Sequence, residues 1–317
     1  MNMKSIFQRT TLSLSLGIAG FCLTVAQPSF ASQNDGTSQK PLRVVLIPAD
    51  GGTEDGTKKD FQPVFSAITQ ATGINFDIKV GQSYSAAVEA MCSGAADIAF
   101  YGPATYLQAK SRGCAELLAL AVRGGGSVYY SGVFARADAN VNSMAEIKGK
   151  RVALGDVNST SSFNVPVAMM MQSGVKVWSD ASKINMAGSH ANVLNAMSEG
   201  LSDVGGASFD SFEKAVNAKA IDPTKFKVVA KSSPIPYPPL AIHPKVDSAV
   251  KTKLRSAFDT VHTMPGITKD QIRGYGGTKV DAYTSKVSEE DMANAGKLFE
   301  LVTDNIKQDI MKKAAQR

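Results

Sequence analysis

The chain has 317 residues with 34 basic and 28 acidic side chains, which gives a formal net charge of +6. This length suits two lobes or one large α/β domain. The basic residues are spread along the chain without a block of interleaved aromatics, so nucleic-acid binding is not expected. The three histidines (His190, His243 and His262) form no His-Glu-x-x-His motif, and the chain has neither a Gly-x-Ser-x-Gly elbow nor a phosphate-binding Gly-x-x-x-x-Gly-Lys-Ser/Thr loop. The sequence therefore predicts no enzyme and no metal or cofactor.

The first 31 residues have the pattern of a secretory signal peptide. Lys4 and Arg9 precede an apolar run at residues 11–26, and the small residues Ser29 and Ala31 flank Phe30. A transmembrane anchor is the alternative, but this run is shorter than the roughly 20 residues that a span needs. We therefore expect a periplasmic protein that is cleaved after Ala31.

A lipoprotein anchored at Cys22 is disfavoured, because the bulky Phe21 precedes this cysteine. Cleavage after Ala31 removes two basic and no acidic residues, which leaves 32 basic against 28 acidic side chains in the mature chain. This mildly basic balance suits attraction of small anions. Residues 32–40 are expected to form a flexible polar tail.

Two cysteines remain after cleavage, Cys92 and Cys114, in a compartment that permits disulfides. We predict a bond between them, since one ends a predicted helix and the other follows the next helix. Two unpaired buried thiols stay possible. Metal ligation is a weak alternative, because the pair has no histidine nearby.

Strands alternate with helices in the first part of the chain, which predicts a largely parallel sheet covered by helices. The expected strands are residues 42–48, 75–80, 97–101 and 117–122. The expected helices are residues 58–72 and 84–93 and one that begins at Pro103.

A second unit of the same kind follows a break at residues 124–126, which are all glycine. Its expected strands are residues 128–135, 151–154, 183–186, 203–207 and 226–230, and mainly helical sequence follows residue 243. Extended crossings near residues 124–136 and 231–243 would join the units. The sequence thus predicts a two-lobed, hinged α/β protein, with residues 41–130 and 241–317 in lobe 1 and residues 131–240 in lobe 2.

The segment 156–166 (Asp-Val-Asn-Ser-Thr-Ser-Ser-Phe-Asn-Val-Pro) joins a strand to an apolar helix and is typical of an oxyanion-binding helix N-terminus. Unpaired N–H groups, the helix dipole and hydroxyl donors would all favour an anion there. The alternative is an ordinary N-cap on a surface helix. Pro166 should kink this helix or set its first turn apart.

Five segments carry a resemblance to a known family, and they occur in the family's order. They are Tyr84-x-x-x-Val-Glu-Ala-Met, Asp97-Ile-Ala-Phe-Tyr-Gly-Pro, Asp156-x-Asn-Ser-Thr-Ser, Ala187-Gly-Ser-His-x-Asn and Asp203-Val-Gly. Over roughly residues 41–275 the chain resembles the phosphonate/phosphite substrate-binding proteins of ABC importers. This resemblance implies a type II-like periplasmic-binding-protein fold with two hinge crossings, whose lobes close on a ligand that is delivered to a membrane permease.

The resemblance also implies a set of ligand-binding residues, each of which has a structural alternative as a packing or capping residue. They are Tyr84, Tyr101, Ser159, Thr160, Ser161 and His190, and Asp210 is a further candidate because it follows a predicted strand. The Ser/Thr hydroxyls and His190 would hold the phosphorus-bound oxygens, and the two tyrosines would reach the ligand from the other lobe. Asp210 would either cap a helix or face the side of the ligand that lacks the oxyanion.

The return crossing at residues 234–239 (Pro-Ile-Pro-Tyr-Pro-Pro) contains no carboxylate that could pair with a ligand ammonium. Tyr237 and the prolines would narrow the pocket. We therefore expect phosphite or a very small phosphonate such as methylphosphonate rather than 2-aminoethylphosphonate. Binding of another anion, such as phosphate, sulfate or a carboxylate, is the alternative.

Overall fold

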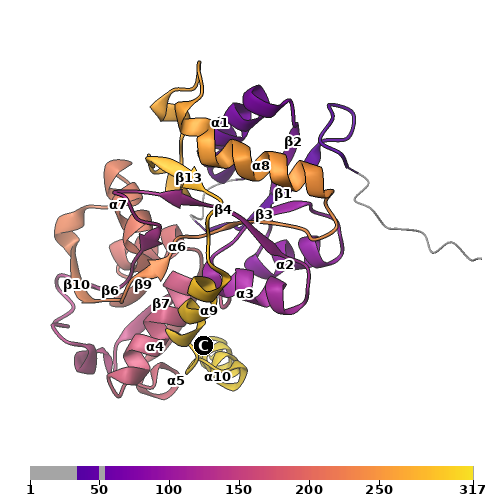
Figure 1. The fold of residues 1–317 in the computed structure, drawn as a ribbon. Helices are drawn as coiled ribbons and strands as arrows, with labels where there is room; N and C mark the ends of the chain where they lie inside the picture. Colours follow the sequence, from indigo (N-terminus) through magenta and orange to yellow (C-terminus); the bar gives the residue numbers. More distant parts are fainter. Residues whose placement is uncertain (1–33, 50–53, 317) are drawn as a thin grey trace, which may run out of the picture. The chain divides into compact units, whose positions relative to one another are not determined.

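The computed structural model describes residues 34–49 and 54–316 (Figure 1). The predicted signal peptide and the glycines at positions 51 and 52 lie outside these residues. No helix in the described ranges is both long enough and apolar enough to span a membrane.

The first sheet has six strands in the order β13-β4-β12-β3-β1-β2. Its strands are β1 (Leu42–Leu46), β2 (Phe76–Val80), β3 (Ile98–Phe100), β4 (Glu116–Val122), β12 (Leu240–Ile242) and β13 (Ala282–Thr284). β1 pairs in parallel with β2 and β3, whereas β12 and β13 pair antiparallel with their neighbours. The helices of this lobe are α1 (Glu54–Thr72), α2 (Tyr84–Cys92), α3 (Pro103–Ser111) and α8 (Ser248–Thr260). The predicted β-α alternation is therefore confirmed here.

The second sheet has five strands in the order β10-β6-β9-β7-β8. Its strands are β6 (Ser131–Arg136), β7 (Arg151–Gly155), β8 (Lys183–Gly188), β9 (Val204–Ser208) and β10 (Phe226–Lys231). Its helices are α4 (Val165–Gln172), α5 (Val177–Asp180), α6 (His190–Ser198) and α7 (Phe209–Asn217). β7 is parallel to β8 and β9, and β6 is antiparallel to β9 and β10. The two-lobed α/β architecture follows from these two separate sheets.

Two adjacent glycines in β9 let helices approach both faces of the second sheet. A Cβ atom on Gly206 would lie 2.7 Å from Cγ of Pro166 in α4, and one on Gly205 would lie 2.6 Å from Sδ of Met197 in α6. Successive strand residues point to opposite faces, so each glycine makes room for a different helix. This close approach packs the first turn of α4 and the C-terminal part of α6 against the same strand.

The two lobes repeat one ion pair at equivalent places. Arg43 at the start of the first sheet binds Asp97 through both its backbone N–H and its guanidinium, and Arg151 binds Asp203 in the same way in the second sheet. Burial tends to raise the pKa of Asp97, but the hydrogen bonds from Arg43 and Asn34 leave it lowered. The bonds from Arg151 lower the pKa of Asp203. Each ion pair therefore joins the beginnings of two neighbouring strands, β1 and β3 in the first sheet and β7 and β9 in the second.

These lowered pKa values predict a loss of stability in acid. A carboxylate whose pKa falls on folding stabilises the fold above its unfolded pKa, about 3.8 here, and this contribution disappears as the pH falls through the folded pKa. We expect the free energy of unfolding, measured by urea denaturation, to decline below about pH 4. Asp203→Asn should make that decline shallower. An acid dependence identical to that of the unsubstituted protein would contradict the assignment.

The crossings between the lobes include a short antiparallel pair, β5 (Val128–Tyr129) with β11 (Ile235–Pro236). The prediction of one strand over residues 128–135 is wrong in this detail, because β5 pairs with the returning chain while β6 enters the second sheet. The triple glycine before β5 forms a turn in which Gly124 and Gly125 have positive φ. Two extended crossings therefore connect the lobes as the sequence predicts.

The C-terminal part departs from the predicted run of helices and from the predicted lobe boundary. Residues 262–288 contain short 3-10 turns and the edge strand β13, which pairs with β4. Helix α9 (Glu289–Lys297) packs against α3, and α10 (Asp304–Ala314) packs against α5 and β8 of the second sheet (Figure 1). Ile310 of α10 belongs to the core of that sheet. The last helix therefore lies on the second lobe, although the sequence assigned it to the first.

The predicted disulfide between Cys92 and Cys114 is confirmed, with 4.9 Å between their Cα atoms. It joins the end of α2 to the segment that leads into β4. The part of the predicted flexible tail that is described, residues 34–40, is attached to the first lobe. Asn34 donates to Asp97, and Asn75 donates its backbone N–H to the carbonyl of Gly36.

Candidate functional site

The Ser-rich turn, residues 159–162, lies at the start of a helix whose first turn is π-helical and whose continuation is α-helical. Residues 160–164 form a π-helical turn, and α4 continues from Val165 with Pro166 in its first turn. Pro166 has no N–H to donate, and the separate first turn that it predicts is confirmed. Oγ of Ser159 caps the turn, accepting from the N–H of Ser162 at 3.2 Å and from its hydroxyl at 2.7 Å.

A glycine at the end of β7 makes this turn possible. A Cβ atom on Gly155 would lie 2.0 Å from Oγ of Ser162 and 2.7 Å from its Cβ atom. Such distances are far below van der Waals contact, so no other residue fits at position 155 without moving the turn. The sequence Leu-Gly-Asp therefore positions the Ser-rich turn against the strand.

The Ser-rich turn is buried, and elements of the first lobe cover it. Ser159, Thr160 and Ser161 are each at most 3% exposed. Oγ1 of Thr160 accepts from the backbone N–H of Ala104, in the first turn of α3, at 2.8 Å. From the second sheet itself, Oγ of Ser131 in β6 donates to the carbonyl of Ser161 at 2.8 Å. The surface-cap alternative is therefore wrong, because this helix begins at the junction of the two lobes.

The N-terminus of α2 also reaches the segment that precedes the turn. The backbone N–H of Tyr84 lies 3.4 Å from Oδ2 of Asp156, and Asn158 donates to Oγ of Ser85 at 2.8 Å. Burial raises the pKa of Asp156, although hydrogen bonds from Asn158 and Tyr84 oppose the rise. The N-termini of α2, α3 and α4 thus meet at one place, and their dipoles favour a negative charge there.

His190 is held in one tautomer at the start of α6. Its Nδ1 accepts from the backbone N–H of Ser208 at 3.0 Å, so its proton lies on Nε2 when the ring is neutral. Nε2 is 3.4 Å from Oγ of Ser159. The backbone N–H of His190 donates to the carbonyl of Ala49 in the first lobe at 3.0 Å. The prediction that His190 lies beside the Ser-rich turn agrees with this placement.

The two tyrosines that were predicted from the first lobe differ in their placement. Tyr84 is buried at the N-terminus of α2, next to the segment that leads into the turn. The hydroxyl of Tyr101 donates instead to the carbonyl of Ala87 in its own lobe, at 3.0 Å. Burial raises the pKa of Tyr101. Its hydroxyl is therefore engaged in packing α2 onto β3, and the structure does not direct it at the turn.

Two tyrosines that the sequence did not predict as site residues lie at the candidate site. Tyr129 contacts the Ser-rich turn, and Tyr275 packs against Tyr129 and His190. Burial raises the pKa of Tyr129, while the hydroxyls of Ser161 and Thr160 lower it through hydrogen bonds. The ring of Tyr275 lies edge-on to Tyr129, with centroids 6.1 Å apart, and its centroid is 6.0 Å from that of His190. These tyrosines come from the crossing and from the C-terminal part of the chain.

Asp210, in the first turn of α7, is 7% exposed and lies beside a cation of the first lobe. Its Oδ1 is 3.4 Å from Nη1 of Arg123. The pKa of Tyr237 is raised, first by burial and then by the charge of Asp210. Tyr237 itself packs against Tyr129, with ring centroids 6.0 Å apart. The carboxylate thus faces this aromatic group and is already paired with a guanidinium.

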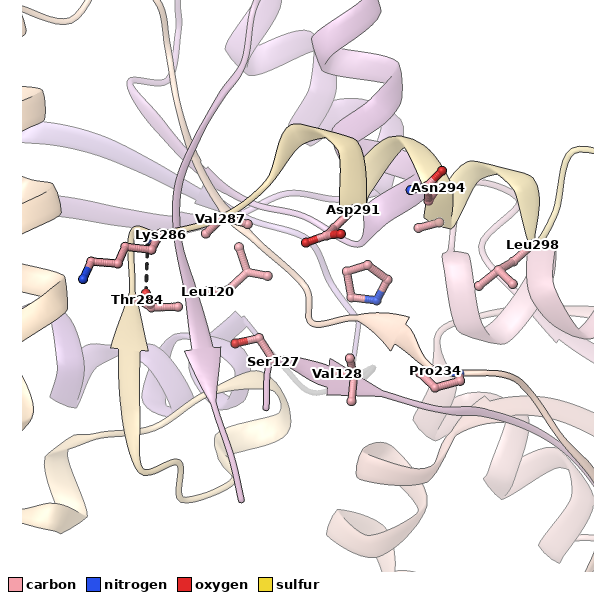
Figure 2. A pocket seen from close by; sticks show the side chains of 12 residues that line it. Leu120, Ser127, Val128, Pro234, Thr284, Lys286, Val287, Asp291, Asn294 and Leu298 are labelled. Atoms are coloured by element: carbon pink, nitrogen blue, oxygen red, sulfur yellow. Dashed lines mark hydrogen bonds between the residues drawn. The ribbon is translucent and has the colours of Figure 1, made fainter. Parts of the chain in front are cut away.

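A separate cavity of about 420 Å³ lies beside the crossings (Figure 2). Val128 and Pro234 line it from the crossings, and Asp291 and Leu298 line it from the region of α9. None of the predicted site residues lines this cavity. The described residues also contain no group of three His, Cys, Asp or Glu side chains that could hold a metal ion.

A family model described as the periplasmic phosphonate substrate-binding protein of an ABC transporter matches residues 51–277. The chain belongs to this family. Its members are substrate-binding transport proteins rather than enzymes, as the sequence predicted, and their periplasmic location implies export. This protein is therefore a phosphonate-binding component of an ABC transporter.

Several known proteins are similar to it. Phosphate-import protein PhnD of Mycolicibacterium smegmatis is 29% identical over 228 residues, which cover 68% of this chain and 70% of the relative. The phosphonates-binding periplasmic protein of Escherichia coli is 24% identical over 240 residues, 74% of this chain and 69% of the relative.

The solved structures are 17–19% identical to the chain and support the fold alone. PhnD1 of Prochlorococcus marinus, solved in complex with methylphosphonate, has a TM-score of 0.72 and covers 83% of this chain and 98% of its own. A binding component of a phosphonate transporter from Pseudomonas aeruginosa has a TM-score of 0.69, with coverage of 86% and 98%. The predicted periplasmic-binding-protein fold is therefore confirmed.

Proposed function

We propose that the protein captures phosphite or a very small phosphonate, such as methylphosphonate, between its lobes and delivers it to the permease of an ABC importer. The observation that carries this proposal is the buried Ser-rich turn, where hydroxyls, helix N-termini and His190 gather while the described carboxylates nearby already have partners.

Hydrogen-bond donors of the site would bind the oxygen atoms of the ligand. Thr160 accepts from Ala104, and the hydroxyls of both Thr160 and Ser161 lie beside Tyr129, where they could donate to an oxyanion. The Nε2 proton of His190 points to the same region as Ser159. Hydrogen bonds to a charged group are worth about 1.5–3 kcal/mol each, so a few such donors are sufficient for tight binding of an oxyanion.

The partners of the nearby carboxylates disfavour a ligand with an ammonium group. Asp210 pairs with Arg123, and Asp156 accepts from Tyr84 and Asn158. A buried ammonium would have to share one of these carboxylates with its present partners, which reduces the compensation for its loss of water. Aromatic rings of Tyr129 and Tyr275 suit the P–H or P–CH₃ group of a small ligand instead.

A thermal-shift panel tests this proposal. Ligands that bind only the folded state raise the melting temperature in proportion to the logarithm of their concentration over their Kd. We expect phosphite and methylphosphonate to give larger shifts than 2-aminoethylphosphonate at equal concentration. The largest shift with phosphate, sulfate or a carboxylate would instead assign the protein to another anion.

We also propose that export ends with cleavage after Ala31, because the small residues Ser29 and Ala31 flank Phe30. Intact-mass measurement of the protein isolated from the periplasm should show Ser32 as its first residue. An uncleaved N-terminus, or the added mass of a lipid on Cys22, would contradict this prediction.

A further inference from the structure

A charged pocket of about 550 Å³ lies between the lobes, beside α1 and α7. It is lined by α1 and the loop after Tyr275 on one side and by α7 on the other. Its charged lining side chains are Arg123, Lys214, Arg273, Lys279, Asp60 and Glu213. Each of its four cations is paired with a carboxylate, so a cation becomes available to attract an anion only where such a pair separates.

This charged pocket borders the candidate site. Arg123 lines the pocket and reaches Asp210, and Gly276 follows Tyr275, whose hydroxyl is 3.0 Å from Oγ of Ser211. The lining of the pocket therefore adjoins Asp210 and Tyr275, which lie beside the candidate site. An anion that entered between α1 and α7 would pass the cations first.

One ion pair in the pocket connects the lobes. Nζ of Lys214 in α7 is 2.5 Å from Oδ2 of Asp60 in α1, and the two side chains are 33% and 17% exposed. A Cβ atom on Gly277 would lie 2.4 Å from Oδ1 of Asp60, so this glycine leaves room for the carboxylate. Any motion that separates α1 from α7 must break the pair.

We propose, on the basis of the function proposed above, that Lys214 acts twice in the binding of the anion. While the lobes are apart, its ammonium attracts the anion to the charged pocket. When they close, the same ammonium pairs with Asp60 and slows the departure of the ligand. Asp60 therefore affects only the second step, and Lys214 affects both.

Stopped-flow binding of methylphosphonate separates these steps, with a fluorophore on Asn195→Cys, an exposed position of α6. Asp60→Asn should raise the dissociation rate about fivefold, the equivalent of about 1 kcal/mol for one partly exposed pair, without lowering the association rate. Lys214→Met should raise the dissociation rate similarly. It should also lower the association rate and weaken its dependence on salt, because a steering charge is lost.

Lys253→Met, in α8 and outside the charged pocket, is the matched control and should change neither rate. The proposal is overturned if Asp60→Asn dissociates at the unsubstituted rate. It is equally overturned if Lys214→Met associates with the same rate and salt dependence as Lys253→Met.

A ligand-free measurement distinguishes failure of this proposal from failure of the proposed function. Spin labels on Ser66→Cys in α1 and Asn195→Cys in α6 report the distance between the lobes by pulsed electron resonance. Asp60→Asn should shift that distribution to longer distances than Lys253→Met does. If the unsubstituted protein binds neither phosphite nor methylphosphonate, the proposed function fails, and this distance alone decides whether the ion pair holds the lobes together.

Discussion

Ser161→Ala should weaken binding of the phosphorus oxyanion by roughly tenfold to a hundredfold, because a hydrogen bond to a charged group contributes about 1.5–3 kcal/mol. The fold should persist, since the contact of Ser161 with Ser131 uses the backbone carbonyl rather than the lost hydroxyl. Isothermal titration calorimetry measures the affinity, and urea denaturation measures the free energy of unfolding.

The matched control for this substitution is Ser173→Ala, at the exposed C-terminal end of the same helix. It removes an identical hydroxyl without touching the candidate site, so its affinity should equal that of the unsubstituted protein. Equal affinity of Ser161→Ala and Ser173→Ala would mean that Ser161 does not hold the ligand.

Gly155→Ala should have a larger effect, because the added Cβ atom would lie 2.0 Å from Oγ of Ser162. The Ser-rich turn must then shift, and a shift of this kind disturbs several ligand contacts at once. We expect binding to fall by more than a hundredfold and the free energy of unfolding to fall by about 1–3 kcal/mol.

A second substitution distinguishes a local shift from general misfolding. Gly155→Ala/Ser162→Gly removes both Ser162 atoms that clash and should recover part of the lost stability. Gly126→Ala, whose added Cβ atom would meet no atom within 4 Å, is the control and should keep both affinity and stability. If Gly155→Ala behaves like Gly126→Ala, the turn is not packed as described.

Much of the fold could be predicted because its central strands are apolar runs bounded by glycine or proline. Val152 and Leu154 of β7, for example, are fully buried between polar segments. The edge strand β13 was missed because Ala282–Thr284 is a short segment with no distinctive periodicity, and only its pairing with β4 defines it. The position of α10 likewise depends on contacts with a sheet more than a hundred residues away in sequence.

Site residues that are positioned by local sequence could be predicted, whereas those positioned by distant contacts could not. Ser159 and His190 could be predicted because strand-to-helix junctions position them locally. Tyr129 and Tyr275 reach the turn only through the crossing and the C-terminal loop, so no local pattern marks them. For Tyr101, the position at the end of a strand could be predicted, but the direction of its hydroxyl, which donates to Ala87, could not.

Calorimetric titration of the mature protein with phosphite, methylphosphonate, 2-aminoethylphosphonate, phosphate and sulfate measures which of these anions it binds most tightly. Oxygens held by the Ser-rich turn, with Asp210 paired to Arg123, predict the lowest Kd for phosphite or methylphosphonate. Tightest binding of 2-aminoethylphosphonate, or of phosphate or sulfate, would contradict the account.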